Sequence, residues 1–183
     1  FGDGGDVRAL DVRVDDELRA AFELVSPWGG GPVRLGIRGV HNVANALAAA
    51  TVALGLGVPL DEVVAGLESS GSSPWRMDLQ RASSGLLVLN DAYNAGPASM
   101  AAALRSLESL PAVRRVAVVG VMAELGDTAA EEHRRITELA ESLDVHLVPV
   151  ATELYGVAPV PDTDEALATL GGLGLGDGDV VLV

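Results

Sequence analysis

The feature that most constrains the fold is a change in hydrophobic period along the chain. Between residues 10 and 37 apolar and polar residues alternate, which is typical of strands with one solvated face. From residue 86 onward, short apolar runs such as residues 116–119 alternate with segments of helical period, such as the one that begins at Pro97. Alternating strands and helices predict a mostly parallel sheet with right-handed crossovers. The predicted fold class is therefore α/β, with a mostly parallel sheet preceded by a β-meander and helices.

The bounds of the predicted elements follow from these periods. In the first part we expect strands over 10–14, 22–24 and 33–37, a turn at the glycine-rich residues 29–32, and helices over 41–56 and 61–67. In the second part we expect strands over 77–82, 86–90, 116–119, 145–150 and 180–183, and helices from 97, from 128 and over 163–170. Thr128 and Glu131 form a capping-box pattern at the start of the second of these helices.

Residues 68–74 are small and polar and end in a proline, a composition typical of a linker. We therefore expect two domains, over residues 1–71 and 72–183. The chain begins at Phe1 and ends in an apolar run that reads as a strand. We expect it to be a piece of a longer protein.

Charge and missing residue types exclude several functions. The 183 residues include 26 acidic and 12 basic residues, for a formal net charge of −14. An acidic surface repels phosphate, so we expect no nucleic-acid partner. Lysine and cysteine are absent, which excludes a Walker lysine, a lysine Schiff base, a thiolate nucleophile and a disulfide within the chain. The three histidines are too scattered to predict a zinc site, and no apolar run reaches the ~20 residues of a membrane span.

The first polar cluster opens the helix expected from residue 41. Asn42 and Asn45 are three residues apart, and His41 and Asn45 are four apart, so these side chains share one face of a helix. An amide both donates and accepts hydrogen bonds, which suits the edge of an adenine. Helix capping with an exposed polar group explains the same residues.

The second polar cluster follows a predicted buried strand and contains Asp91, Tyr93, Asn94 and Ala95. Ligands of such sheets bind at the carboxyl ends of the strands. A carboxylate at that position can accept the two hydroxyl protons of a ribose, and the loop ahead of the next helix offers backbone N–H groups to an anion. An ordinary polar loop is the alternative.

The third cluster, residues 120–127, follows another predicted strand. Its glycine spacing is not G-x-G-x-x-G, which disfavours a nicotinamide dehydrogenase. Glu124 could contact a ligand amine, whereas His133 could equally be a surface or capped residue. Arg76, directly after the linker, could reach a phosphate bound by the neighbouring domain, and a solvated arginine is the alternative.

In order and spacing these clusters resemble the Mur ligase family. The resemblance is carried by residues 39–49, by residues 90–97 with Ser99 and Met100, and by Gly120 with residues 122–126 and His133. It covers essentially the whole chain. The tyrosine-containing loop and the Glu-Leu-Gly motif most resemble the members that add D-alanyl-D-alanine to UDP-N-acetylmuramoyl-tripeptide.

The resemblance implies a three-domain enzyme of peptidoglycan precursor synthesis. Residues 1–71 would be the end of its central ATP-binding domain, and residues 72–183 most of its Rossmann-like C-terminal domain. The enzyme would be cytoplasmic and monomeric, and would activate the tripeptide carboxylate as an acyl phosphate with ATP and Mg²⁺. Those two ligands would be held mainly by residues outside this chain, so we expect the chain alone to be inactive.

The resemblance also implies roles for single residues. The nucleotide would be bound by His41, Asn42 and Asn45 at the adenine, Arg76 at the phosphates and Asp91 at the ribose. The incoming dipeptide would lie near Tyr93, Asn94, Ala95, Glu124 and His133.

Two positions depart from the family pattern. Gly96 replaces the second asparagine of the usual Tyr-Asn-Ala-Asn-Pro, and Val121 replaces an acidic residue. The first change removes an amide and the second a charge, and both concern the dipeptide contacts more than the ATP contacts.

Two alternatives stay open. One is another amino-acid ligase of the same superfamily, such as a folylpolyglutamate-type or D-glutamate-adding enzyme. The other is a non-catalytic α/β module that binds a nucleotide or a peptide.

Overall fold

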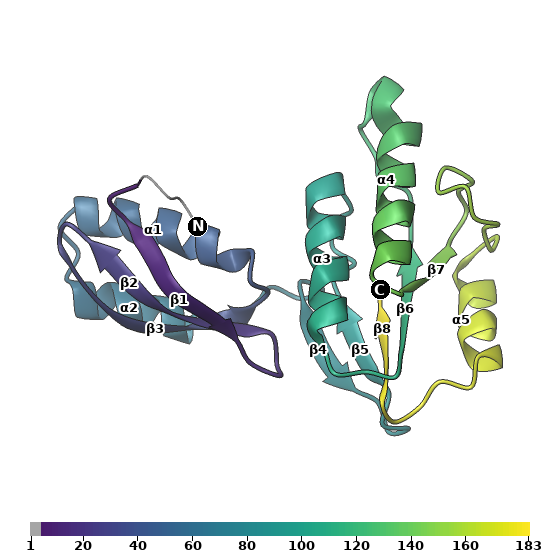
Figure 1. The fold of residues 1–183 in the computed structure, drawn as a ribbon, viewed down its shortest axis with the longest axis horizontal. Coiled ribbons are helices and arrows are strands. Elements are labelled where there is room, and N and C mark those ends of the chain that lie inside the picture. Colours follow the sequence, from purple (N-terminus) through teal and green to yellow (C-terminus); the bar gives the residue numbers. More distant parts are fainter. Residues whose placement is uncertain (1–4) are drawn as a thin grey trace. The chain divides into compact units, whose positions relative to one another are not determined.

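The computed structural model describes residues 5–183 and divides the chain into two compact units (Figure 1). The first unit ends at Ser73 and the second runs from Pro74 to Val183. Each unit has its own sheet, of three and five strands respectively. The predicted linker begins too early, because its first two residues still belong to a helix that ends at Ser69.

The sheet of the first unit is an antiparallel meander, as predicted. Its strands lie in the order β1 (Arg8–Val14), β2 (Arg19–Ser26) and β3 (Gly29–Arg38). Two helices follow, α1 (Asn42–Gly55) and α2 (Leu60–Ser69). Both helices were predicted, with ends that differ by a few residues.

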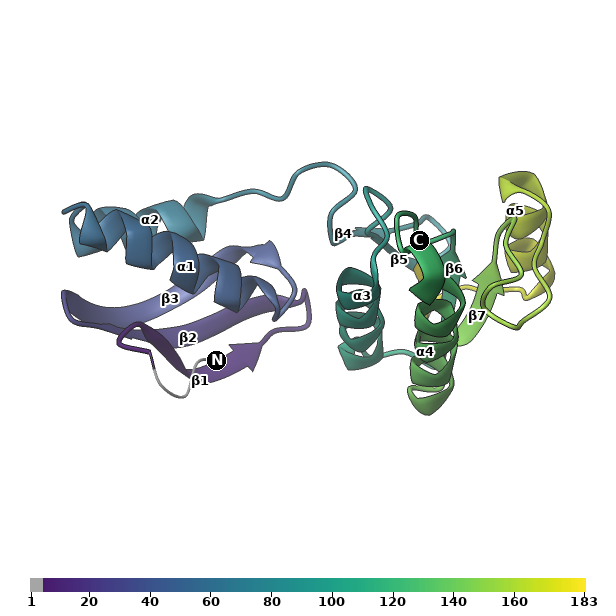
Figure 2. The same cartoon turned by 90° about the horizontal axis from the view of Figure 1, so that it is seen from above.

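One face of this sheet is apolar because alternate residues of a strand point to the same side. Phe22 and Leu24 of β2 are buried together with Val33 and Leu35 of β3. Helices α1 and α2 cover this face (Figure 2), and Val43 of α1 is fully buried against it. This packing fixes the start of α1, where the first polar cluster lies.

The turn predicted at residues 29–32 is wrong. The turn lies earlier, at Pro27 and Trp28, because a proline presets the backbone of the first central turn position. The glycine run belongs instead to β3, where a Cβ on Gly30 would clash with the carbonyl oxygen of Leu24. Glycine serves here for the close approach of two strands.

The second unit contains the mostly parallel sheet that the sequence predicts. Its strands are β4 (Asp78–Arg81), β5 (Leu87–Asn90), β6 (Arg114–Val119), β7 (His146–Pro149) and β8 (Asp179–Leu182). They lie in the order β4-β5-β8-β6-β7, and only β4 runs antiparallel to its neighbour. The last strand in the sequence therefore lies in the middle of the sheet, between β5 and β6.

Helices cover both faces of this sheet (Figures 1 and 2). Helices α3 (Pro97–Ser109) and α4 (Ala129–Ser142) pack side by side on one face, α3 against β6 and β8 and α4 against β7. Helix α5 (Thr163–Gly172) covers the other face, where Leu170 packs on a cluster of buried valines from β6, β7 and β8. Because β5 and β6 both run parallel to β8, the loops that leave their carboxyl ends lie at the same edge of the sheet.

The capping box predicted at Thr128 does not form. A short 3₁₀ helix, η1 (Gly126–Thr128), leads directly into α4, and the backbone of Thr128 is helical, with φ −85° and ψ −4°. A capping side chain needs an extended backbone to accept from the first turn. The Thr128 hydroxyl donates to the carbonyl oxygen of Leu125 instead, at 2.9 Å.

Candidate functional site

A pocket of about 510 Å³ lies at the carboxyl ends of the parallel strands of the second unit. The loop after β5 borders it with Asp91, Asn94 and Ala95, and the loop after β6 borders it with Gly120 and Val121. The other lining residues are one threonine, Thr163, and the apolar Ala92, Met100, Ala103, Val118, Val119, Val150, Leu182 and Val183. This is the edge at which parallel α/β sheets bind ligands.

The loop after β5 is held by the short segment that precedes β4. The backbone N–H of Met77 donates to Asp91 Oδ1 at 3.0 Å, and the N–H of Tyr93 donates to the carbonyl oxygen of Trp75 at 3.1 Å. The guanidinium carbon of Arg76 lies 4.1 Å from the centroid of the Tyr93 ring, a cation–π distance. The structure thus brings together Arg76 and two residues of the second cluster.

The loop after β6 is held from the opposite side, by two buried rings. The Tyr155 hydroxyl donates to the carbonyl oxygen of Gly120 at 2.7 Å, and the N–H of Met122 donates to His133 Nε2 at 3.0 Å. Tyr155 and His133 are 1% and 0% exposed, and their rings contact edge to face with centroids 4.7 Å apart. Burial raises the pKa of Tyr155, so its hydroxyl stays a protonated donor.

His133 is neutral in this arrangement. Its Nδ1 lies 2.6 Å from the carbonyl oxygen of Ala129, which can only accept, so Nδ1 carries the proton. Nε2 has no proton, because it accepts from Met122. Both ring nitrogens therefore have partners within the protein, and the ring holds the loop after β6. A direct contact of His133 with a dipeptide stays a prediction.

The other residues predicted for the dipeptide lie at different depths. Asn94 and Ala95 line the pocket. Tyr93 is 59% exposed, with its ring against Arg76. Glu124 is exposed and has a φ of +63°, and it is not among the residues that line the pocket.

The polar cluster of the first unit forms a short chain of hydrogen bonds at the start of α1. The amide nitrogen of Asn42 donates to the carbonyl oxygen of Arg38 at 2.6 Å, and that of Asn45 donates to Asn42 Oδ1 at 2.8 Å. His41 occupies the N-cap position, but its side chain makes no capping hydrogen bond. The chain of bonds orients both amides, and Asn45 is exposed.

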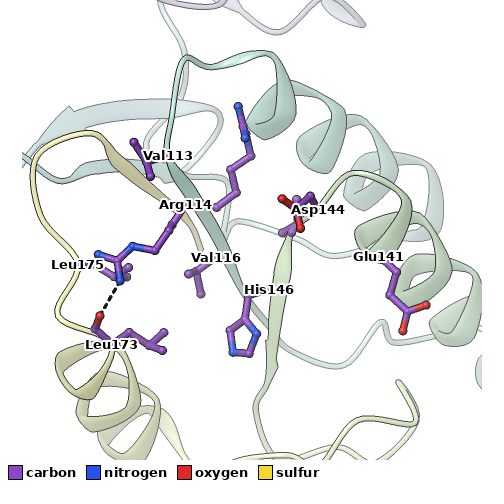
Figure 3. A pocket seen from close by; sticks show the side chains of 10 residues that line it. Val113, Arg114, Val116, Glu141, Asp144, His146, Leu173 and Leu175 are labelled. Atoms are coloured by element: carbon purple, nitrogen blue, oxygen red, sulfur yellow. Dashed lines mark hydrogen bonds between the residues drawn. The ribbon is translucent and has the colours of Figure 1, made fainter.

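A second pocket, of about 530 Å³, lies at the amino ends of β6 and β7 (Figure 3). Its Arg114 is already bound within the protein. Its guanidinium donates to both carboxylate oxygens of Asp179, at 3.0 and 2.6 Å, and to the carbonyl oxygen of Leu173 at 2.8 Å. The hydrogen bond from Arg114 lowers the pKa of Asp179. We assign no ligand to this pocket.

Within residues 5–183, no group of three or more histidine, aspartate or glutamate side chains is arranged to hold a metal ion. No residue in that range is therefore assigned to Mg²⁺. In the same part of the chain, no helix has the length and apolar character needed to cross a membrane.

Comparison with known proteins decides the family. The family model for the Mur ligase, glutamate ligase domain matches residues 75–183, more than half of the chain. The chain belongs to the Mur ligase family. A curated relative of this Mur ligase chain is the UDP-N-acetylmuramoyl-tripeptide–D-alanyl-D-alanine ligase of Mycobacterium tuberculosis, which is 44% identical over 155 residues. The alignment covers 81% of this chain and 30% of the relative, so the chain spans about a third of the length of that protein.

Solved structures agree with this family membership. A crystal structure of MurF from Acinetobacter baumannii has a TM-score of 0.86 and 36% identity, and the match covers 100% of this chain and 42% of that one. MurF of Thermotoga maritima, crystallised with ADP, has a TM-score of 0.80 and 26% identity, with 99% and 43% covered. The expected resemblance and the expected α/β fold class are both confirmed.

Sequence reasoning missed Tyr155. It lies 35 residues beyond Gly120 and belongs to none of the three clusters. One weak signal was available: aromatic residues make up only 3% of this Mur ligase chain, and a buried tyrosine hydroxyl needs a hydrogen-bond partner. Which partner it finds depends on the folded structure.

Proposed function

We propose that this chain is part of an ATP-dependent ligase that joins D-alanyl-D-alanine to UDP-N-acetylmuramoyl-tripeptide. The observation that carries the proposal is the 44% identity over 155 residues to the M. tuberculosis protein of that name. The pocket at the carboxyl ends of the strands supports it, because two clusters of the family resemblance border that pocket.

On this proposal the predicted nucleotide-binding residues have the roles that the family resemblance implies. The amides of Asn42 and Asn45, linked by a 2.8 Å hydrogen bond, bind the edge of the adenine next to His41. Asp91 accepts hydrogen bonds from the ribose hydroxyl groups, and Arg76 binds the phosphates through the N–H donors of its guanidinium. The ADP in the T. maritima structure supports a nucleotide as a ligand of such chains.

The dipeptide occupies the pocket between the two loops of the second unit. The lining is rich in alanine and valine, which suits the two methyl groups of D-alanyl-D-alanine. Asn94 offers an amide for the peptide group, and Ala95 and Val121 complete the wall. Contacts from Tyr93, Glu124 and His133 to the dipeptide stay predictions.

In the proposed reaction the tripeptide carboxylate takes the γ-phosphoryl group of ATP and becomes an acyl phosphate. The dipeptide amine then attacks the acyl carbon, a peptide bond forms, and ADP and phosphate are released. This chain contributes binding and orientation of the nucleotide and the amine. It contains no lysine for the transferred phosphoryl group, so we expect no ligation by the chain alone.

The proposal is tested with the complete protein that contains these residues. Its coding sequence should include, upstream, a glycine-rich loop with lysine followed by serine or threonine. ADP release should require both UDP-N-acetylmuramoyl-tripeptide and D-alanyl-D-alanine, and glutamate should not replace the dipeptide. A preference for glutamate would favour another ligase of the superfamily, and a missing lysine loop would favour the non-catalytic module.

A further inference from the structure

The segment that carries Arg76 has a backbone that needs outside support. The residues on either side of it, Trp75 and Met77, have φ values of +61° and +48°, in a region that side-chain-bearing residues rarely adopt. Such strain persists only where surrounding contacts over-determine the conformation. Two of these contacts come from one loop, through Asp91 Oδ1 and the N–H of Tyr93. The backbone around Arg76 is thus fixed by the loop after β5.

The side chain of Arg76 is supported by the same loop. Its guanidinium lies on the face of the Tyr93 ring at 4.1 Å, while no carboxylate among residues 5–183 forms an ion pair with it. A carboxylate would occupy the N–H donors and cancel the charge. An aromatic face attracts the cation and leaves the N–H groups at the guanidinium edge able to bind an anion.

We propose that Tyr93 is a positioning residue for Arg76, whose guanidinium it holds ready for the polyphosphate of the nucleotide. This inference rests on the proposed function, in which Arg76 binds the ATP phosphates. It gives Tyr93 a role on the nucleotide side of the site, although the family resemblance links that residue to the dipeptide. The ring face matters for this role, and the hydroxyl does not.

The expected effects differ among three substitutions. Arg76→Ala should weaken tripolyphosphate binding about tenfold, because it removes charge-assisted hydrogen bonds. Tyr93→Leu should weaken it about threefold, the effect of one exposed cation–π contact. Tyr93→Phe keeps the ring face and should bind as the unsubstituted chain does.

The chain offers a reporter for this experiment. It has two tryptophans, and Trp28 lies in the first unit, so Trp28→Phe leaves Trp75, directly beside Arg76, as the only indole. In that background we would titrate inorganic tripolyphosphate and follow Trp75 emission. Arg81→Ala is the matched control, since it removes an exposed arginine of the same unit that pairs with Asp177. Its affinity should stay within the error of the unsubstituted chain.

The results separate this inference from the proposed function. A loss with Tyr93→Leu that Tyr93→Phe rescues, with unchanged melting temperatures, supports the positioning role. Tripolyphosphate binding that depends on Arg76 but is unaffected by Tyr93→Leu would overturn the inference and leave the proposed function standing. Binding that does not depend on Arg76, or no binding at all, would also overturn it. The proposed function is judged separately, by ligation with the complete protein.

Discussion

The two loops that border the pocket are held in opposite ways. The loop after β5 is held near the surface, by Asp91 and Tyr93, which contact a segment only 14 to 18 residues earlier in the sequence. The loop after β6 is held from the interior, by the fully buried His133 and Tyr155. Leaving a buried donor or acceptor without its partner is costly. One side of the pocket is therefore held by contacts with a neighbouring segment of the chain, and the other by two buried side chains.

The largest effect should come from His133→Ala. This substitution leaves a cavity and removes the partners of Met122 N–H and the Ala129 carbonyl, so we expect the second unit to lose about 3 kcal/mol of stability. Chemical denaturation measures the loss, with His146→Ala as the control because His146 is exposed. A loss as small as that of the control would mean that the ring does not hold this loop.

Tyr155→Phe should have the next largest effect. It keeps the ring but leaves the Gly120 carbonyl without its donor, at a cost of about 1 to 2 kcal/mol. Amide hydrogen exchange should rise at Val121 and Met122. The matched control, Tyr93→Phe, removes an exposed hydroxyl and should leave stability and exchange unchanged. Equal effects of the two substitutions would contradict the contrast between the loops.

Two substitutions of Asp91, to asparagine and to alanine, should test whether its carboxylate oxygen holds the segment that contains Met77. Asparagine keeps an oxygen that can accept from the N–H of Met77, whereas alanine removes it, and the difference should be about 1 kcal/mol. The exchange rate of the Met77 amide is the readout. If asparagine and alanine give the same rate, the carboxylate oxygen does not hold this segment.

Acid should weaken the ion pair between Arg114 and Asp179, which lies in strands of the sheet and not in the two loops that border the pocket. Arg114 lowers the pKa of Asp179 below its usual value of 3.8. The pair therefore contributes stability that is fully present above that value and is lost as the pH falls through the lowered pKa. In acid, Asp179→Asn should lose less of its remaining stability than the unsubstituted chain, as followed by thermal unfolding. If the two proteins lost stability equally in acid, the pKa of Asp179 would be the same in the folded and the unfolded chain, which would contradict this prediction.

The fold was predictable to the extent that it depends on local pattern. The strand period of two and the helical period located both sheets and the helices α1 to α5, because each period reflects which face of an element is buried. The turn at Pro27 and the absence of a capping box at Thr128 were not predictable in this way. At Gly30 the close approach of Leu24 decides the conformation, and at Thr128 the preceding 3₁₀ turn does.

The candidate site likewise has a part that local spacing predicts and a part that depends on the folded structure. Spacing predicted that Asn42 and Asn45 share a helix face, and the structure joins them by a hydrogen bond. The stack of Arg76 on Tyr93 and the bond from Tyr155 to Gly120 join residues 17 and 35 positions apart. The first contact requires β4 to pair with β5, and the second requires β6 to pair with β7. The sequence could therefore name the residues and not their partners.

The most direct test of the account is an NMR titration of this chain with D-alanyl-D-alanine, followed by ATP, with L-alanyl-L-alanine as the control ligand. We expect saturable shifts in residues 91–95 and 120–126 with the D,D-dipeptide alone, larger in the loop after β5 than in the loop after β6. ATP should then shift Asn42, Asn45 and Asp91, and Asp91→Ala should reduce that response. No shift in either loop, or the same shifts with L-alanyl-L-alanine, would contradict the claim that these two loops form one dipeptide site.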